Sequence, residues 1–150
     1  MAKVNVGIIG QGRSGRNIHG NYLIGQPRKF KIVAVSDPMK ERRERAEKEY
    51  GCETVADYKD LFKRDDLDLI INATPSHLHV PVSLEILRAG FNCLCEKPLA
   101  HRARDVDRII AAADKAGKIM AVYQQNRYNP TFKQVRKVVE SGVLGRLAKI

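Results

Sequence analysis

The stretch Val4-Asn5-Val6-Gly7-Ile8-Ile9-Gly10-Gln11-Gly12-Arg13-Ser14-Gly15 decides the fold of this 150-residue chain. Its first half is short and almost wholly apolar, as expected of a strand buried on both faces of a parallel sheet. Its second half has the spacing G-x-G-x-x-G, and residues 16–24 can complete a helix that must end before Pro27. The stretch therefore predicts a strand, a tight glycine turn and a helix.

The glycine turn predicts a site for a pyrophosphate. Gly10 permits the tight turn, Gly12 lets the backbone approach a pyrophosphate, and Gly15 lets the helix pack closely on the strand. The loop is completed by Gln11, Arg13 and Ser14. Phosphates would meet the free N–H groups and the positive dipole end of the helix. A plain strand-to-helix turn is the alternative, and the strand and helix on either side favour the nucleotide site.

The alternation of strand and helix continues along the chain. Further strands are expected at residues 31–36, 67–73, 92–95 and 119–122. Further helices are expected at residues 40–50, 57–63, 81–89, 103–116 and 130–141. The fold class is therefore α/β, a Rossmann-type doubly wound parallel sheet with helices on both faces and right-handed crossovers.

Two parts are expected along the chain. Residues 1–123 would form a dinucleotide-binding domain, and residues 124–150 a connecting helix and the start of a substrate domain. The apolar pattern over residues 142–150 looks like a new strand, and domains seldom end on such a pattern without a partner strand. We therefore expect a fragment of a longer two-domain protein.

Charge and composition restrict the class of protein. The chain has 27 Lys and Arg against 17 Asp and Glu, a net charge of +10 that suits nucleic-acid binding in amount. The densest charged run, Lys40 to Lys48, alternates in sign like a solvated helix face, and the aromatic residues are scattered. No nucleic-acid partner is therefore expected. No apolar stretch approaches the roughly 18 residues of a membrane span, and no secretory signal begins the chain, so we expect a cytoplasmic protein without a membrane partner.

Neither a disulfide framework nor a metal site is expected. The cysteines are Cys52, Cys93 and Cys95, an odd number without a C-x-x-C pair, which indicates reduced thiols. His77 and His79 have a spacing that a metal could use, but no third ligand accompanies them. A loop or helix-entry role is favoured for both histidines.

Asp37 predicts the choice of cofactor. It follows the second strand, 22 residues beyond the last glycine of the loop, near the spacing of a carboxylate that binds the adenosine ribose. Because a carboxylate there repels a 2′-phosphate, we expect NAD rather than NADP. Arg13, Arg42 and Arg43 could compensate by meeting that phosphate, but a solvated helix face is favoured for Arg42 and Arg43. Asp37 could also cap the helix that begins after Pro38.

Two more segments follow strands and are expected at the same edge of the sheet. They are Asn72-Ala73-Thr74-Pro75-Ser76-His77-Leu78-His79 and Cys95-Glu96-Lys97-Pro98-Leu99. Lys97 is an isolated lysine between a strand end and a proline, a place where a side chain can be desolvated and used in chemistry. A structural partner of Glu96 and a phosphate contact are the alternatives, and the residues alone leave them open.

Together these segments resemble the N-terminal domain of the glucose-fructose oxidoreductase, inositol dehydrogenase and rhizopine-catabolism (Gfo/Idh/MocA) family. The resemblance runs from Val4 to Ile150. It rests on the glycine loop, the place of Asp37, and three motifs: Ala73-Thr74-Pro75 with His79, Glu96-Lys97-Pro98, and Asn126-Arg127-Tyr128-Asn129-Pro130. Glu-Lys-Pro after a strand, in register with the glycine loop, is the specific part.

The resemblance implies an NAD(P)-dependent oxidoreductase that transfers hydride between nicotinamide and a sugar, an inositol or a related polyol. Lys97 would lie beside the nicotinamide and the substrate hydroxyl and assist the proton transfer. Thr74 and Pro75 would flank the nicotinamide ribose, with Glu96 near it, and Arg127 would lie near the carboxamide. The predicted cofactor site also includes the glycine loop, Asp37, Pro38 and His79.

The family's other proton-transfer residues, an aspartate and a histidine of the second domain, would lie beyond Ile150. The resemblance therefore implies that the 150-residue chain binds dinucleotide but turns over little or no substrate alone. The full-length protein is expected to be a homo-oligomer. A non-enzymatic relative that senses dinucleotide with the same domain is the alternative, and a lysine at position 97 favours the enzyme.

Overall fold

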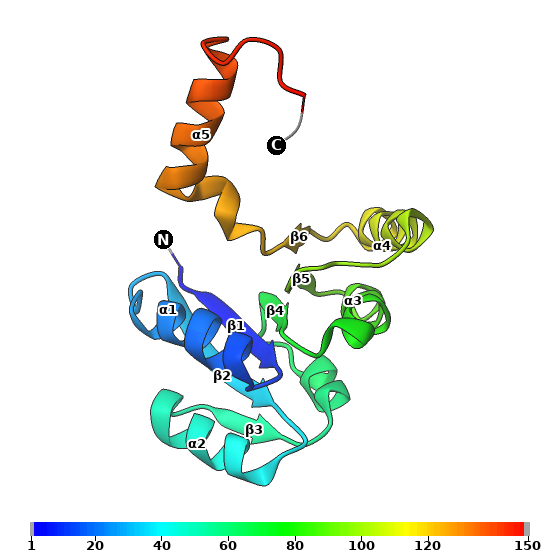
Figure 1. Cartoon of the computed structure of the whole chain (residues 1–150). Coiled ribbons are helices and arrows are strands. Elements are labelled where there is room, and N and C mark those ends of the chain that lie inside the picture. Colours follow the sequence, from blue (N-terminus) through cyan, green and yellow to red (C-terminus); the bar gives the residue numbers. More distant parts are fainter. Residues whose placement is uncertain (1, 149–150) are drawn as a thin grey trace.

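A computed structural model describes residues 2–148 and contains a six-stranded parallel sheet (Figure 1). The strands are β1 (Val4–Ile9), β2 (Phe30–Ser36), β3 (Glu53–Val55), β4 (Leu69–Asn72), β5 (Asn92–Cys95) and β6 (Met120–Val122). Their order across the sheet is β3-β2-β1-β4-β5-β6, and every neighbouring pair is parallel. This order is that of the doubly wound dinucleotide-binding fold, so the predicted fold class is confirmed.

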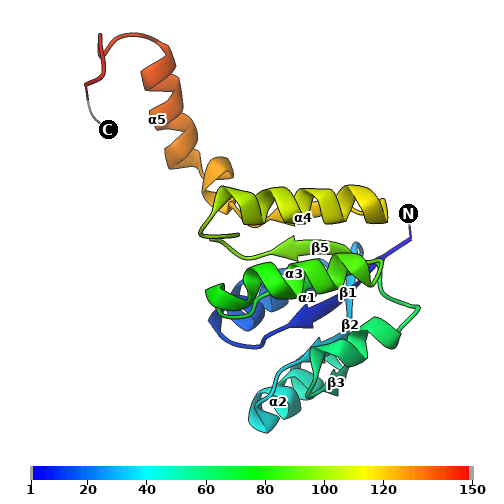
Figure 2. The ribbon, with the colours of Figure 1, turned by 90° about the vertical axis from the view of Figure 1, so that its right-hand side faces the viewer.

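Helices connect the strands. A π-helix (Arg13–Gly20) continues into α1 (Asn21–Ile24), and the other α-helices are α2 (Lys40–Tyr50), α3 (His79–Arg88), α4 (Ala103–Ala116) and α5 (Pro130–Glu140). Short 3₁₀ helices cover Tyr58–Lys63, Ser76–Leu78 and Gln125–Tyr128. In Figures 1 and 2, α3 and α4 cover one face of the sheet, α1 and α2 cover the other, and α5 extends away from it. None of the helices within residues 2–148 is long and apolar enough to cross a bilayer.

The central strands bury side chains on both faces of the sheet. Val6 and Ile8 of β1 pack in one core with Leu23 and Ala46 from the helices of that face. Ile9 packs in the other core, together with residues of α3 and α4 such as Leu87 and Ile109. Each fully buried Val, Leu or Ile side chain stabilises the fold by about 1.5–3 kcal/mol. Burial on two sides explains why β1 is nearly continuous in apolar residues.

Several elements differ from the sequence prediction. The pattern does not predict β3, because this strand has only three residues and lies at the edge of the sheet, where a polar residue such as Glu53 is exposed. The first helix begins at Arg13 instead of residue 16, inside the glycine loop. The predicted strand is wrong over residues 142–148, which form turns, bends and irregular backbone, because no described strand lies alongside to pair with them. The rest of that predicted strand, residues 149–150, lies outside the described residues.

Candidate functional site

A cavity of about 820 Å³ opens where β1, β2 and β4 end. Ligand pockets of proteins are commonly about 300–1,000 Å³. Carboxyl ends of parallel strands are also where doubly wound folds bind ligands. The predicted site residues that line this cavity are Gly10, Gly12, Arg13, Ser14, Asp37, Pro38, Thr74 and Pro75.

The three glycines of the loop have different surroundings. Gly10 has a φ of +93°, which L side chains rarely adopt, and its N–H donates to the carbonyl of Ser36 at 2.7 Å. A Cβ added at Gly15 would overlap the carbonyl oxygen of Gly10, so turn and helix meet backbone to backbone. A Cβ at Gly12 would meet only Nη1 of Arg42, at 3.8 Å. Gly10 and Gly15 therefore build the turn, while Gly12 leaves open space, as a bound pyrophosphate requires.

The helix after the loop points its N-terminus at the same cavity. Its N-cap is Gly12, whose carbonyl accepts a hydrogen bond from the N–H of Arg16 at 3.0 Å. The first N–H groups of a helix have no partner within the helix and attract anions. Arg13 and Ser14, the first residues of this helix, line the cavity. The loop thus combines open space with hydrogen-bond donors, and it fits the phosphates of a dinucleotide.

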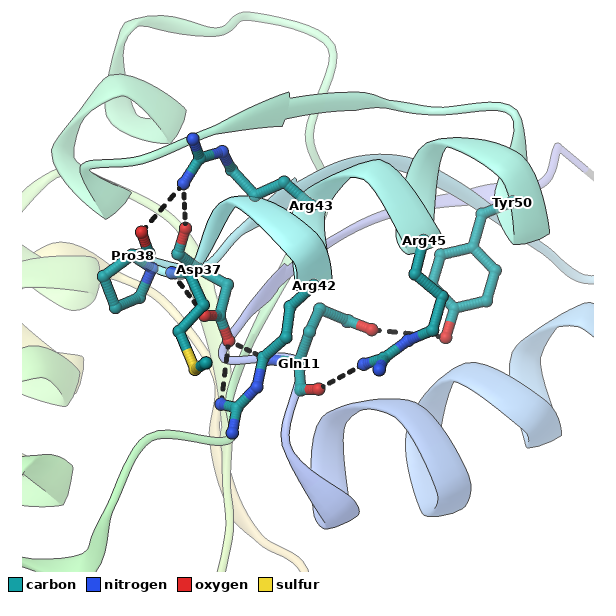
Figure 3. Close-up of polar contacts among 8 residues, drawn as sticks. Gln11, Asp37, Pro38, Arg42, Arg43, Arg45 and Tyr50 are labelled. Atoms are coloured by element: carbon teal, nitrogen blue, oxygen red, sulfur yellow. Dashed lines mark hydrogen bonds and ion pairs between the residues drawn. The ribbon is translucent and has the colours of Figure 1, made fainter.

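Asp37 lies at the end of β2, and only 2% of it is exposed. Its carboxylate accepts hydrogen bonds from the N–H of Gln11 at 2.7 Å and from the N–H of Met39 at 2.9 Å (Figure 3). Nη1 of Arg42 lies 3.4 Å from Oδ2. Asp37 therefore shapes the turn before α2 rather than capping the helix itself, whose N-cap is Met39.

Arg42 and Arg43 do not lie on a simple solvated face, so that expectation is wrong. Arg42 faces the carboxylate of Asp37, and its side chain is 39% exposed. Nη1 of Arg43 donates to the carbonyl oxygens of Asp37 at 2.8 Å and Pro38 at 3.0 Å (Figure 3). The cause is the end of β2, which presents a carboxylate and two carbonyl acceptors to the first turn of α2.

Gln11 points away from the cavity, toward α2 (Figure 3). Its carbonyl oxygen accepts a hydrogen bond from Nη2 of Arg45 at 2.9 Å, and its Oε1 accepts one from the hydroxyl of Tyr50 at 3.3 Å. Burial raises the pKa of Tyr50, which keeps that hydroxyl protonated as a donor. Gln11 is 1% exposed and does not line the cavity. Its side chain therefore anchors the loop from behind.

His79 joins the loops that follow β4 and β5. Only 2% of it is exposed, and it lies behind the cavity wall instead of lining it. Its Nδ1 lies 2.7 Å from the carbonyl oxygen of Pro98, and its Nε2 lies 2.9 Å from that of Thr74. Carbonyl oxygens only accept hydrogen bonds, so a ring N–H is the donor in any hydrogen bond that this imidazole makes to them.

Glu96 is also buried and is held by a residue that the sequence analysis did not single out. Its Oε1 lies 2.9 Å from Nε2 of His19 in the π-helix, and its Oε2 accepts a hydrogen bond from the N–H of Lys97 at 3.3 Å. The ring of His19 packs edge-on against Tyr123, with centroids 4.6 Å apart. Burial lowers the pKa of His19, and Glu96 opposes that shift. No local signal could have found this contact, because its partners are 77 residues apart.

Lys97 and Arg127 are exposed and do not line the 820 Å³ cavity. Arg127 lines a separate cavity of about 780 Å³ beside β5 and β6, together with Tyr22 and Tyr123. The structure therefore gathers most of the predicted residues around one cavity, buries Gln11, Gly15, His79 and Glu96 without making them line it, and leaves these two residues outside. Within residues 2–148, no three His, Cys, Asp or Glu side chains gather as metal ligands would.

Comparison with known proteins gives a matching family and individual relatives. Residues 4–124 match the Gfo/Idh/MocA family, described as an oxidoreductase family with an NAD-binding Rossmann fold. Inositol 2-dehydrogenase 4 of Saccharopolyspora erythraea is 31% identical over 146 residues, which are 96% of this chain and 43% of that protein.

Similar chains are also found among solved protein structures. The WlbA dehydrogenase of Bordetella pertussis, in complex with NADH and UDP-GlcNAcA, is 33% identical with a TM-score of 0.86, over 96% of this chain and 41% of that one. KijD10, a 3-ketoreductase of Actinomadura kijaniata in complex with NADP, is 28% identical with a TM-score of 0.88, over 97% of this chain and 46% of that one. The chain spans less than half the length of these relatives. It belongs to the Gfo/Idh/MocA oxidoreductase family and carries that family's NAD-binding Rossmann domain.

Proposed function

We propose that this chain is the cofactor-binding part of an NAD-dependent dehydrogenase whose substrate is a sugar, an inositol or a related polyol. One observation carries the proposal: the glycine loop, Asp37 and Thr74-Pro75 line a single cavity at the ends of β1, β2 and β4. Its match to a family of NAD-binding oxidoreductases supports the redox reading, and the relatives compared above include an inositol dehydrogenase. None of those relatives supports the alternative of a non-enzymatic dinucleotide sensor.

The lining residues suggest how a dinucleotide would lie. Asp37 and Pro38 would receive the adenosine ribose, and the open space over Gly12 would receive the pyrophosphate. Thr74 and Pro75, on the β4 side of the cavity, would flank the nicotinamide ribose. A carboxylate at the ribose favours NAD over NADP, because a 2′-phosphate would meet a second negative charge.

The chemistry at the nicotinamide end would fall to Lys97. NAD, when bound, supplies the acceptor for a hydride that leaves the carbinol carbon of the substrate. Nζ of Lys97 would hold the substrate hydroxyl and help to move its proton as the carbonyl forms. Glu96, through its hydrogen bond to the N–H of Lys97, would hold the backbone of this residue. Arg127 would approach the carboxamide.

The remaining assignments concern the whole protein. We place the boundary of the dinucleotide-binding domain after residue 123 and assign residues 124–150 to the connection with a substrate domain. That domain would supply a further aspartate and histidine, as in the family. The assignment is supported by the 43% of an inositol dehydrogenase that the chain spans. The whole protein would be a cytoplasmic homo-oligomer without nucleic-acid or membrane partners, and the chain alone would turn over little or no polyol.

Three measurements test the proposal. Titration of the chain with NADH and NADPH, followed by nicotinamide fluorescence, should give saturable binding with a preference for NADH. A folded chain that binds neither nucleotide would refute the cofactor site. In the whole protein, Lys97→Met should abolish polyol-dependent reduction of NAD while leaving NADH binding within about twofold, since its binding contacts lie elsewhere. Polyol-dependent turnover by the 150-residue chain alone would contradict the need for a second domain.

A further inference from the structure

We propose that His79 is a positioning residue, a buried strut that holds the loop carrying Thr74 and the loop carrying Lys97 at a fixed separation. The inference rests on the proposed function, because it concerns the nicotinamide end of the same site. It assigns His79 no contact with the cofactor. The residue acts through the two loops on either side of its ring.

His79 connects the two loops beyond the point where the pairing of β4 with β5 ends. β4 and β5 pair as far as Asn72 and Cys95, and the N–H of Glu96 donates to the carbonyl of Asn72 at 3.0 Å. Beyond this bond, no backbone hydrogen bond within residues 2–148 connects the segment after Asn72 with the segment after Glu96. The next polar connection runs through the imidazole of His79, which contacts Thr74 O and Pro98 O.

The backbone of His79 is itself held by the end of β4. Its backbone carbonyl accepts a hydrogen bond from Nδ2 of Asn72 at 3.2 Å, and the same amide donates to Oγ of Ser83 at 3.1 Å. Oδ1 of Asn72 accepts a hydrogen bond from the hydroxyl of Thr74 at 2.6 Å. The first turn of α3 is therefore tied to the end of β4. Because His79 is 2% exposed, water does not compete for its ring nitrogens.

Each of the two loops that His79 contacts carries a predicted residue of the nicotinamide end of the site. Thr74 lines the nucleotide cavity, and Pro98 follows Lys97 directly in the chain. On the other side of Lys97, Glu96 is held by His19. The residue before Lys97 and the residue after it thus each contact a buried histidine. A lysine held in this way has fewer backbone positions open to it, so its Nζ spends more time where the substrate would lie.

The chemistry of the ring allows the two contacts to be removed one at a time. The amide nitrogen of Asn lies close to where Nδ1 of histidine lies, so His79→Asn offers a donor to Pro98 and loses the ring contact with Thr74. The amide nitrogen of Gln lies close to where Nε2 lies, so His79→Gln offers a donor to Thr74 and loses the ring contact with Pro98. His77→Asn and His77→Gln are matched controls, because His77 is exposed two residues earlier.

The test compares NADH with ADP-ribose, which lacks the nicotinamide, on the 150-residue chain. Both His79 variants should weaken NADH binding about tenfold while the Kd for ADP-ribose stays within about twofold, and the His77 variants should change neither. A ratio of the two Kd values that stays at its original value in both His79 variants would overturn the inference. This outcome includes a parallel loss of affinity for both ligands, which indicates a merely structural role. If the unsubstituted chain binds neither ligand, that result would instead refute the proposed function as a cofactor-binding domain.

A second measurement covers the case in which the His79 variants fail to fold. In the unsubstituted chain, NMR should show a ring N–H of His79 that exchanges slowly and couples across its hydrogen bond to the carbonyl carbon of Thr74 or Pro98. Ring N–H exchange as fast as that of the exposed His77 would overturn the inference.

Discussion

The backbone N–H of Gln11 donates a hydrogen bond of 2.7 Å to Oδ2 of Asp37, so the carboxylate that ends β2 also holds the loop that follows β1. The bond is buried and joins residues 26 apart in sequence. Asp37 thus shapes the loop, besides the contact with the adenosine ribose that we propose for it. Substitutions at this position will affect both.

Asp37→Asn should weaken NADH binding about tenfold or more, since a hydrogen bond to a charged group contributes about 1.5–3 kcal/mol. The preference for NADH over NADPH should shrink at the same time, because the 2′-phosphate no longer meets a carboxylate. Fluorescence titration with both nucleotides measures the two effects. Asp107→Asn, on the exposed face of α4, is the control. An unchanged ratio of the two affinities would show that Asp37 does not select the cofactor.

Gly15→Ala should lower the stability of the fold, whereas Gly12→Ala should lower the affinity for NADH. The new Cβ at position 15 would overlap the carbonyl of Gly10, so the loop must shift, and a thermal melt should show a loss of about 1–3 kcal/mol. The new Cβ at position 12 meets nothing closer than 3.8 Å, so stability should stay while NADH affinity falls. Equal NADH affinity in Gly12→Ala and the unsubstituted chain would mean that no phosphate approaches Gly12.

His19 should make the stability depend on pH. Its pKa in the folded chain lies below the unfolded value of about 6.5 because it is buried. Between these two values the unfolded chain binds more protons, so the free energy of unfolding should fall as the pH drops below about 6.5. One group contributes at most about 1.4 kcal/mol per pH unit.

Chemical denaturation at intervals from pH 7.5 to 5.5 measures this effect. His19→Gln removes the titrating ring and should flatten the dependence, while the other three histidines remain as an internal control. Carboxylates with lowered pKa values, Glu49 and Asp66, act at more acidic pH and leave this window clear. The same slope in both proteins would place the proton uptake elsewhere.

The cysteines should resist thiol reagents in the folded chain. Burial raises the pKa of Cys52 to about 11, of Cys93 to about 12 and of Cys95 to about 11, and the reactive species is the thiolate. Reaction with a chromogenic disulfide at pH 8 should be slow until denaturant is added, after which all three thiols react. Rapid reaction of one equivalent in the native chain would reveal a local opening around that cysteine.

The features predictable from sequence are those whose cause is local. A buried strand followed by G-x-G-x-x-G predicts β1, the loop and the helix, because turn geometry and helix polarity act within a few residues. Asp37 and Thr74 come directly after strands, so the parallel sheet alone brings them to one edge. The residues around the cavity were predictable for this reason.

Contacts between distant segments were not predictable in the same way. The pairing of His19 with Glu96 depends on how the first helix crosses the sheet, and no spacing rule links the two positions. Arg43 and Arg45 resemble any charged helix residues in sequence, and only the packing of α2 shows that they donate to Asp37, Pro38 and Gln11. β3 has too few residues to show a strand period.

The guanidinium of Arg42 lies between Oδ2 of Asp37, 3.4 Å away, and the open space over Gly12, where an added Cβ would be 3.8 Å away. This guanidinium therefore lies beside the carboxylate that we propose for the adenosine ribose. A ribose hydroxyl that binds Oδ2 would compete with this side chain for it, so binding there would replace one partner of the carboxylate by another. The affinity for the adenosine end would then report a difference between two partners, and added salt, which screens the Arg42–Asp37 ion pair more than a hydrogen bond to a neutral hydroxyl, would shift that difference toward the ribose.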